Sequence, residues 1–307
     1  MTGWTTADMA SQTGRFFVVT GATGGLGLET ALALAKAGGE VLLTGRNPAK
    51  GEAALSHIRA VYPDARIAFG LCDVASLAAV NAFADRLIAE GRPIHVLINN
   101  AGVMATPKRE LTVDGFELQF GTNVTGHYLL TARLMPLLRA APDPRVVQLA
   151  SLAHLPGKIF IDDLDAAKNY HPWTRYQQSK LAMLMFALEL QRHSDAGRWG
   201  VTSLAAHPGL AATDLFRRGA ATNLFERIKA FAIGLVCQSA AAGAWPTLMA
   251  ATAPDVMPGG YYGPTGFMEA WGKAGPARIG PSARDDAMAE RLWNTLAKMT
   301  GAIWPSG

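Results

Sequence analysis

The sequence predicts an α/β fold with a doubly wound parallel sheet of the Rossmann type in a single domain. Two observations carry this prediction. Continuous apolar segments alternate with helical segments over about the first two thirds of the chain, and a glycine-rich turn directly follows the first apolar segment. Strands of a parallel sheet are buried on both faces and therefore read as unbroken apolar runs. The chain has 307 residues, half of them hydrophobic, which is enough for one large core.

The expected strands are the apolar runs at 16–20, 40–44, 66–71, 95–100, 145–150 and 201–206. Helices are expected at 26–37, after Pro48, at 76–91 and at 120–134, the last of which carries Asn123. We find no internal repeat and no linker that separates domains. Residues 1–307 are therefore expected to form one domain, with an N-terminal extension at 1–14.

Two long insertions, at 156–173 and 207–237, interrupt the alternation. Both follow the carboxyl end of a predicted strand, which is where open α/β sheets place their ligand crevice. Their apolar side chains suggest a hydrophobic substrate site, but they would serve equally well to cover the core, and both interpretations stay open. The side chains concerned are Phe160, Trp173, Leu215, Phe216, Leu224, Phe225 and Phe231.

Composition argues against several other classes of protein. The net charge is +4 and the basic residues are scattered, so no nucleic-acid-binding stripe is expected. Cys72 and Cys237 lie far apart and favour a reducing, cytoplasmic setting. The first 15 residues lack the pattern of a secretory signal. The segment between Lys229 and Asp255 has no charged residue, but its small and polar residues favour a buried helix pair with a break near Gln238–Ser239 over a membrane span.

The stretch TGATGGLG at 20–27 predicts a dinucleotide site, because it follows a buried strand and opens a helix. Gly21, Gly25 and Gly27 allow the backbone to approach a pyrophosphate, whose charge the helix N-terminus then stabilises. The alternative is a tight turn with no ligand. The turn residues expected at the cofactor are Gly21, Thr23, Gly24, Gly25, Leu26 and Gly27.

The end of the second strand predicts the cofactor. An NAD site of this kind places Asp or Glu there, about 20 residues past the glycines, to bind the ribose 2′-hydroxyl. This chain has Gly45, followed by Arg46 and Asn47. A guanidinium can donate two hydrogen bonds to a 2′-phosphate, so NADP(H) is the expected cofactor.

Tyr176 and Lys180 are four residues apart in RYQQSKLAM, so on a helix they lie on one face about one turn apart. A free tyrosine has a pKa near 10 and is a poor base at neutral pH. A nearby lysine favours the phenolate, so we expect Lys180 to lower the pKa of Tyr176 and Tyr176 to act as acid and base. Ser151 follows a strand, where it either orients a carbonyl oxygen or caps a turn.

TGATGGLG, NNAG (99–102), Asn123, Ser151 and Tyr176-x-x-x-Lys180, in that order, resemble the classical short-chain dehydrogenase/reductase family over nearly the whole chain. WTTADM near the start, HPG (207–209) and YYGPTG (261–266) resemble its retinol-dehydrogenase-like members. At Gly24 many NADP-using relatives carry a second basic residue, so the preference would rest on Arg46. The resemblance implies that Asn123 holds a water connected to Lys180, and that Lys180 donates to the nicotinamide ribose. It also places further residues at the cofactor, namely Asp73, Val74, Asn100, Ala101, Gly102, Pro208, Gly209 and Thr213.

The expected activity is therefore an NADP(H)-dependent interconversion of an alcohol with a ketone or aldehyde, on a bulky apolar small molecule. The alternatives are a non-oxidative epimerase or lyase of the same fold, and a catalytically silent dinucleotide sensor. The resemblance also implies a homodimer or homotetramer that pairs the helices bearing Asn123 and Tyr176. No metal is expected, since His154, His171 and His207 lack ligand spacing and fit turn or pocket-wall positions better.

Overall fold

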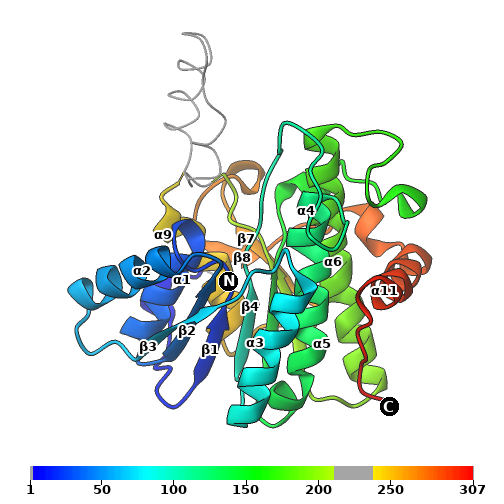
Figure 1. The fold of residues 1–307 in the computed structure, drawn as a ribbon. Helices are drawn as coiled ribbons and strands as arrows, with labels where there is room; N and C mark the ends of the chain where they lie inside the picture. The colour runs from blue at the N-terminus through cyan, green and yellow to red at the C-terminus, as the bar shows by residue number, and fades with distance from the viewer. Residues whose placement is uncertain (1–2, 211–237, 307) are drawn as a thin grey trace.

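The computed structural model describes residues 3–210 and 238–306, which form an eight-stranded sheet with helices on both faces (Figure 1). The strand order is β3-β2-β1-β4-β5-β6-β7-β8. Neighbouring strands from β3 to β7 are parallel, and β8 runs antiparallel to β7 at the edge. The strands are β1 (Phe16–Val19), β2 (Glu40–Gly45), β3 (Ile67–Leu71), β4 (Val96–Asn99), β5 (Arg145–Leu149), β6 (Thr202–Ala206), β7 (Tyr261–Pro264) and β8 (Ala274–Pro276).

The two faces of the sheet bury separate hydrophobic cores, which explains the unbroken apolar runs. In β1, Phe16 and Val18 belong to one core, and Phe17 and Val19 belong to the other. Successive side chains of a strand point to opposite faces, so a strand covered on both sides needs an apolar residue at every position. The doubly wound prediction is therefore confirmed.

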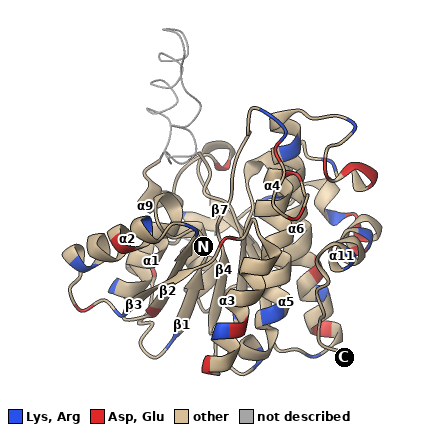
Figure 2. Ribbon diagram, in the orientation of Figure 1, with Lys and Arg blue, Asp and Glu red and all other residues tan. Residues whose placement is uncertain are grey.

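Each core is closed by its own set of helices, which lie on opposite sides of the sheet in Figure 1. The first face carries α1 (Gly25–Lys36), α2 (Pro48–Val61), α9 (Ala240–Gly243) and α10 (Trp245–Thr252). The second carries α3 (Leu77–Glu90), α5 (Gly126–Arg139), α6 (Pro172–Ala196) and α11 (Asp286–Thr300). Lys, Arg, Asp and Glu are scattered over the outer helices and loops of the described chain, and no basic stripe forms (Figure 2).

The six predicted strands are confirmed, each with ends within one residue of the predicted ends. The sequence missed β7 and β8. It also missed the role of the N-terminal segment, because Trp4 is buried and exchanges two backbone hydrogen bonds of 2.8 Å with Ala274 of β8. The expected N-terminal extension is thus paired with the edge of the sheet.

The helix expected at 120–134 is more irregular than predicted. A short helix α4 (Leu118–Phe120) runs into a π-helical turn (Gly121–Thr125), and α5 continues from there. Asn123 lies inside the π-helical turn. Such turns are rare and occur often at functional sites.

The segment after the second insertion is partly described. Ser239 caps the N-terminus of α9, so a helix begins where the sequence predicts the break of the helix pair, near Gln238–Ser239. The first helix of the expected pair, and the insertion beyond Leu210, lie outside the described residues. In the part of the chain that is described, no helix is both long and apolar enough to cross a membrane.

Candidate active site

A cleft of about 550 Å³ opens along the carboxyl ends of the parallel strands. Its walls include Gly21 after β1, Gly45 at the end of β2, Asn100 after β4, Ser151 after β5 and Pro208 after β6. The strand order reverses between β1 and β4, and open α/β sheets bind ligands at such a reversal. Its volume is in the range of small-molecule sites.

The glycine-rich turn forms one end of the cleft. Gly24 is the N-cap residue of α1 and has no side chain to bond the first N–H groups of the helix. These N–H groups and the helix dipole are suited to an anion. Gly27 is needed for close packing, because a Cβ atom there would come 2.5 Å from the Asn100 side-chain nitrogen. The turn therefore fits the pyrophosphate of a dinucleotide.

The end of β2 supplies two cations to the same cleft. Arg46 and Lys50 are exposed and line the cleft together with Gly45 and Asn47. Asn47 begins α2 by accepting a 3.0 Å hydrogen bond from the Lys50 backbone nitrogen, which places Lys50 in the first turn of the helix. The sequence analysis singled out Arg46 but not Lys50, although Pro48 already marked the start of a helix with Lys50 in its first turn.

The segment after β4 is tied to the end of β1 by Thr20. The Thr20 hydroxyl accepts hydrogen bonds of 2.9 Å from the backbone nitrogens of Asn100 and Ala101. The Asn100 side chain donates to the Thr20 carbonyl at 2.7 Å. These contacts fix the backbone at Asn100–Gly102 beside the glycine turn.

Tyr176 and Lys180 lie on one face of α6, as the spacing predicts, with the Lys180 nitrogen 5.9 Å from the centre of the tyrosine ring. Both side chains are buried. Lys180 donates a 2.8 Å hydrogen bond to the Leu149 carbonyl at the end of β5. Trp173, at the start of α6, packs against Tyr176 with 5.4 Å between ring centres and also lines the cleft.

The pKa values of the pair are set mainly by burial. Burial raises the pKa of Tyr176 to about 12, and a hydrogen bond with Ser151 only partly opposes this shift. Burial lowers the pKa of Lys180 to about 8. Burial thus raises the pKa of Tyr176 above its ordinary value, against the expected lowering. The part that Lys180 plays in this pKa stays a prediction. At neutral pH the pair is a neutral phenol beside an ammonium group.

Ser151 caps a turn, which is one of the two alternatives that the sequence left open, and its orientation of a carbonyl oxygen stays a prediction. It caps the short 3-10 turn Leu152–His154 by accepting a 3.2 Å hydrogen bond from the Ala153 backbone nitrogen. It also lines the cleft and influences the Tyr176 phenol. The hydroxyl is thus fixed at the end of β5 beside the candidate acid.

Asn123 is fully buried behind the cleft wall and does not line the cleft itself. Its side chain exchanges two hydrogen bonds with the backbone of Val103, at 2.8 and 3.0 Å, and donates to Ser179 at 2.9 Å. It therefore links the π-helical turn to α6, one residue from Lys180. A water held by Asn123 stays a prediction.

His127 connects Asn123 to the cofactor side of the cleft, a role that the sequence analysis missed. One ring nitrogen, Nδ1, lies 2.9 Å from the Asn123 carbonyl, and the other lies 2.9 Å from the Thr20 hydroxyl. Burial lowers the pKa of His127 to about 4, so the ring is neutral. Because a carbonyl only accepts, Nδ1 carries the proton and Nε2 accepts from Thr20.

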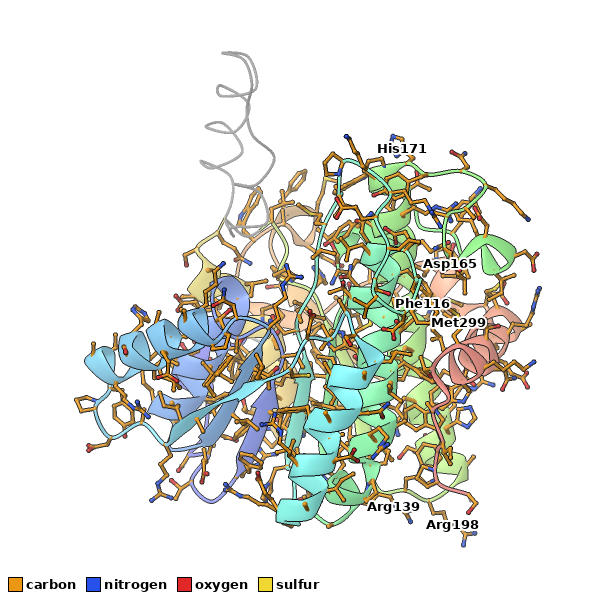
Figure 3. The ribbon with its side chains drawn as sticks, viewed as in Figure 1. Phe116, Arg139, Asp165, His171, Arg198 and Met299 are labelled. Carbon is orange, nitrogen blue, oxygen red and sulfur yellow. The ribbon has the colours of Figure 1, made fainter. Side chains whose placement is uncertain are left out.

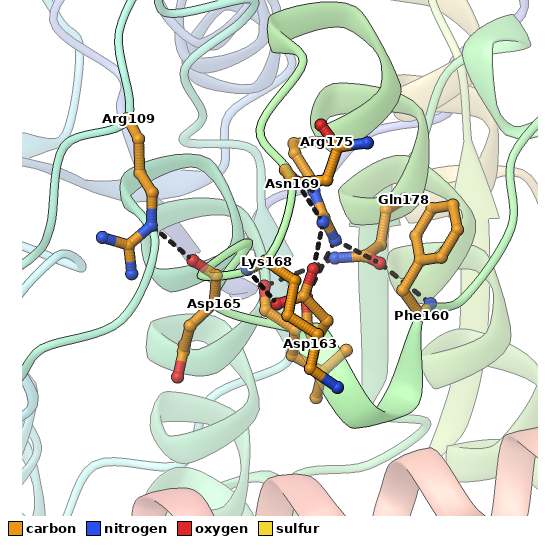
Figure 4. Close-up of polar contacts among 9 residues, drawn as sticks. Arg109, Phe160, Asp163, Asp165, Lys168, Asn169, Arg175 and Gln178 are labelled. Carbon is orange, nitrogen blue, oxygen red and sulfur yellow. Dashed lines mark hydrogen bonds and ion pairs between the residues drawn. The ribbon is translucent and has the colours of Figure 1, made fainter.

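The first insertion is fixed onto α6 by a buried ion pair. Arg175, next to Tyr176, bonds the Asp163 carboxylate at 2.5 Å and also donates to the carbonyls of Asp163 and Asn169 (Figure 4). Phe160 lies under the Arg175 guanidinium and does not line the cleft, whereas Trp173 does. Phe160 is exposed and does not cover the core, so neither interpretation holds for it. The other apolar residues considered with these two lie outside the described chain.

The cleft brings together nearly all of the predicted site residues. Asn123 is placed behind the wall, and Thr213 lies outside the described residues. Among the described residues no cluster of His, Cys, Asp and Glu could hold a metal ion. The predicted residues that line the cleft are Gly21, Thr23, Gly24, Gly25, Leu26, Gly27, Arg46, Asn47, Asp73, Val74, Asn100, Ala101, Gly102, Ser151, Tyr176, Lys180, Pro208 and Gly209.

Comparison with known proteins agrees with this arrangement. The family model for short chain dehydrogenase matches residues 15–223. The chain is 42% identical to polyprenol dehydrogenase of Mus musculus, with 95% of this chain and 85% of the relative covered. It is 38% identical to retinol dehydrogenase 12 of Mus musculus, with coverage of 95% and 88%. A crystal structure of an uncharacterised protein from Mycobacterium paratuberculosis superposes with a TM-score of 0.81 at 38% identity, covering 99% of this chain and all of the other.

Proposed function

The chain belongs to the short-chain dehydrogenase family, and we propose that it is an NADP(H)-dependent oxidoreductase that interconverts an apolar alcohol with its aldehyde or ketone. The observation that carries the proposal is the convergence of Ser151, Tyr176 and Lys180 in the cleft that the glycine turn opens into. A dinucleotide with its pyrophosphate at that turn would direct its nicotinamide end towards these three side chains.

The side chains of the cleft have the properties that carbonyl reduction requires. The nicotinamide supplies or accepts the hydride, and the protein must handle the proton at the substrate oxygen. Tyr176 is a neutral phenol at neutral pH, because burial raises its pKa to about 12, so its hydroxyl holds a proton to donate. Ser151 hydrogen-bonds the same oxygen and orients it.

Lys180 supports the reverse direction, in which Tyr176 must accept the proton of an alcohol. Its pKa of about 8 leaves most of the ammonium groups protonated at pH 7, and a positive charge on the same helix face favours the phenolate. The 2.8 Å hydrogen bond to the Leu149 carbonyl keeps this charge at the end of β5. Donation to the nicotinamide ribose is the further role that we propose for it.

The preference for NADP(H) rests on the absence of a carboxylate at the end of β2 and on the presence of Arg46. Lys50 adds a second cation at the same wall of the cleft. It compensates for the lack of a basic residue at Gly24, where many NADP-using relatives have one. Both cations suit a 2′-phosphate.

An apolar alcohol or carbonyl compound suits the walls near Tyr176. Trp173 packs against Tyr176, and the apolar residues that line the cleft with it include Val103, Met104, Leu152 and Leu210. The relatives are named as dehydrogenases of polyprenol and of retinol, both apolar isoprenoid alcohols. We propose a substrate of this chemical class.

The assembly and location implied by the resemblance remain proposals. In the described chain α11 packs against both α5 and α6, the helices expected to pair across a dimer axis. We propose that a homodimer or homotetramer of this protein uses a different face. A cytoplasmic location stays a prediction of the sequence.

The proposed activity is tested by mixing the purified protein with NADPH and a long-chain apolar aldehyde such as retinal, and by following the absorbance of NADPH. We expect oxidation of NADPH in amounts equal to the alcohol formed. Conversion of a substrate with no net change in bound dinucleotide would identify an epimerase or lyase instead, and tight NADPH binding with no turnover of any apolar carbonyl would identify a sensor.

A further inference from the structure

His207 lies at the end of β6, directly before the Pro208–Gly209 turn, and its ring is completely buried. The Gly209 backbone nitrogen donates a 3.2 Å hydrogen bond to Nδ1 of this ring. The other nitrogen, Nε2, lies 3.1 Å from a carboxylate oxygen of Glu269. Because Gly209 N–H can only donate, Nδ1 is the acceptor, and Nε2 carries the proton that bonds Glu269.

Two glycines make this position of the ring possible. A Cβ atom on Gly263 of β7 would lie 1.9 Å from the His207 Nε2 atom. Gly209 has φ of +62°, and a Cβ atom there would lie 2.4 Å from the Ala270 carbonyl. Gly209 of HPG and Gly263 of YYGPTG therefore belong to one structure, in which the His207 ring fills the space beside Gly263.

Glu269 is held towards His207 by an unusual backbone. Met268 and Glu269 have φ of +51° and +57°, a region that residues other than glycine rarely adopt. Such conformations persist where the surroundings fix them. The second carboxylate oxygen accepts a 2.9 Å hydrogen bond from the Arg278 backbone nitrogen. Burial raises the pKa of Glu269, but its bonds to His207 and Arg278 outweigh burial and lower the pKa overall, so the carboxylate stays charged.

The rest of the turn is fixed from the same side. Gln238 donates a 2.7 Å hydrogen bond to the Pro208 carbonyl, and Leu210 donates a 2.8 Å bond to the Ala270 carbonyl. His207 thus accepts from the Gly209 N–H, while the residues on either side, Pro208 and Leu210, are held by Gln238 and Ala270. The Pro208 carbonyl and the Gly209 N–H each have a side-chain partner.

From these contacts we infer that His207 and Glu269 act as a positioning pair, in which the carboxylate fixes the tautomer of the ring and the ring holds the Pro208–Gly209 turn against the nicotinamide end of the cleft. This inference rests on the proposed function, because it assumes that a nicotinamide dinucleotide lies in the cleft. Neither residue lines the cleft, so each acts through the turn. The position of the Pro208–Gly209 turn then determines how tightly the nicotinamide half of the cofactor is held.

Two substitutions of His207 separate its two contacts. His207→Asn keeps an acceptor near the position of Nδ1, since asparagine readily bonds a backbone nitrogen two residues on. His207→Gln keeps a donor near the position of Nε2 but loses that acceptor. Glu269→Gln removes the charge that fixes the tautomer and leaves the ring intact.

The readouts are the affinities for NADPH and for 2′,5′-ADP, which lacks the nicotinamide half, together with the thermal midpoint. We expect His207→Gln to weaken NADPH binding roughly tenfold and His207→Asn to stay within about twofold of wild type, as expected for one hydrogen bond. Binding of 2′,5′-ADP should be unchanged in both variants. Glu269→Gln should weaken NADPH binding about threefold in the wild-type background and not at all beside His207→Asn.

Several results would overturn the inference. Wild-type NADPH affinity in His207→Gln, or an equal loss of 2′,5′-ADP binding, would mean that the ring does not act through the nicotinamide half. If His207→Gln does not fold, an unchanged NADPH affinity in Glu269→Gln would reject the pair. A wild-type protein that binds neither NADPH nor NADH would instead refute the proposed function.

Discussion

Tyr176 lies in a closed environment that favours its protonated form. The ring is buried, Trp173 packs against it, and the Lys180 nitrogen is 5.9 Å from its centre. A phenol in such surroundings is a proton donor at neutral pH. In the proposed function, Tyr176 would therefore act most directly in carbonyl reduction, where it donates the proton that it already holds.

Tyr176→Phe removes this proton and leaves the ring in place. We expect turnover to fall on the order of 10²–10⁴-fold, as for the loss of a general acid. NADPH affinity should change less than twofold, because the hydroxyl contributes little to the walls around the nucleotide. Steady-state rates and a fluorescence titration measure both quantities, and comparable activity in the variant would reject Tyr176 as the acid.

Lys180 predicts a distinct dependence of stability on pH. Its pKa is about 8 in the folded protein and 10.5 in an ordinary lysine, so between these values the unfolded chain binds more protons than the folded one. The free energy of unfolding of the wild type should therefore rise with pH across this window. Below pH 8 the buried charge of Lys180 lowers the free energy of unfolding by its full amount, and above about pH 10.5 this cost is gone.

Lys180→Met removes this cost together with the hydrogen bond to Leu149. We expect the variant to be more stable than wild type by about 2 kcal/mol at pH 7, and the difference to shrink as the pH rises from 8 to 10.5. Urea unfolding at several pH values measures this. A variant that is less stable than wild type by the same amount at every pH would contradict the buried-charge account.

At the residue scale, the sequence predicts chemistry better than environment. The spacing of Tyr176 and Lys180 follows from the helix period, so both were found. The direction of the tyrosine pKa shift depends on burial, which no local pattern shows. The contacts of His127 and His207 were not predicted, because their partners Thr20 and Glu269 lie 107 and 62 residues away.

The junction between β2 and α2 is the element to which we attribute the proposed preference for NADP(H). The strand ends at Gly45, Arg46 follows, and Lys50 lies in the first turn of the helix. Both cations reach the same cleft wall. Their place at the end of a strand and the start of a helix lets a 2′-phosphate meet both.

Arg46→Ala should weaken NADPH binding roughly 10- to 100-fold and NADH binding less than twofold, because a charge-assisted bond to phosphate is lost. Lys50→Ala should give a smaller loss with the same selectivity. Arg139→Ala is the matched control, since Arg139 lies at the opposite end of the molecule (Figure 3). Equal losses for both nucleotides in Arg46→Ala would remove Arg46 from the 2′-phosphate site.

The first insertion depends on Arg175 for its position on α6. The side chains of Arg175 and Asp163 are 4% and 13% exposed, so the pair is taken almost wholly out of water. Arg175→Met should cost about 3–5 kcal/mol of unfolding free energy, because it removes the counter-charge of a largely buried carboxylate and leaves it only backbone N–H partners such as that of Lys168. The double substitution Arg175→Met with Asp163→Leu should recover most of the loss. An equal loss in the double variant would show that the ion pair is not the cause.

At the scale of elements, long apolar runs were predictable and short ones were not. The six predicted strands, each five or six residues long around an apolar centre, were found to within one residue. β8 has only three residues, Ala274–Pro276, and it exists because Trp4 and β7 pair with it from either side. The π-helical turn at Asn123 was equally invisible, since its sequence continues a helical pattern.

The whole molecule is a sheet with one hydrophobic core on each face, and the cleft lies at the carboxyl ends of its parallel strands. Helices of both faces and the loops after β1, β2, β4, β5 and β6 contribute to the cleft. The C-terminal helix α11 completes the second face by burying Leu292, Trp293 and Leu296 against α5 and α6. The site is thus built on elements fixed from both sides, and the first insertion contributes Trp173 to its wall.

The most direct test of the account is a fluorescence titration of the purified protein with NADPH and, separately, with NADH. The account predicts that NADPH binds at least about tenfold tighter, because Arg46 and Lys50 reach a 2′-phosphate that NADH lacks. Equal or tighter binding of NADH would contradict the assignment of the β2–α2 junction. Binding of neither nucleotide would contradict the central claim, that this cleft holds a nicotinamide dinucleotide beside Tyr176.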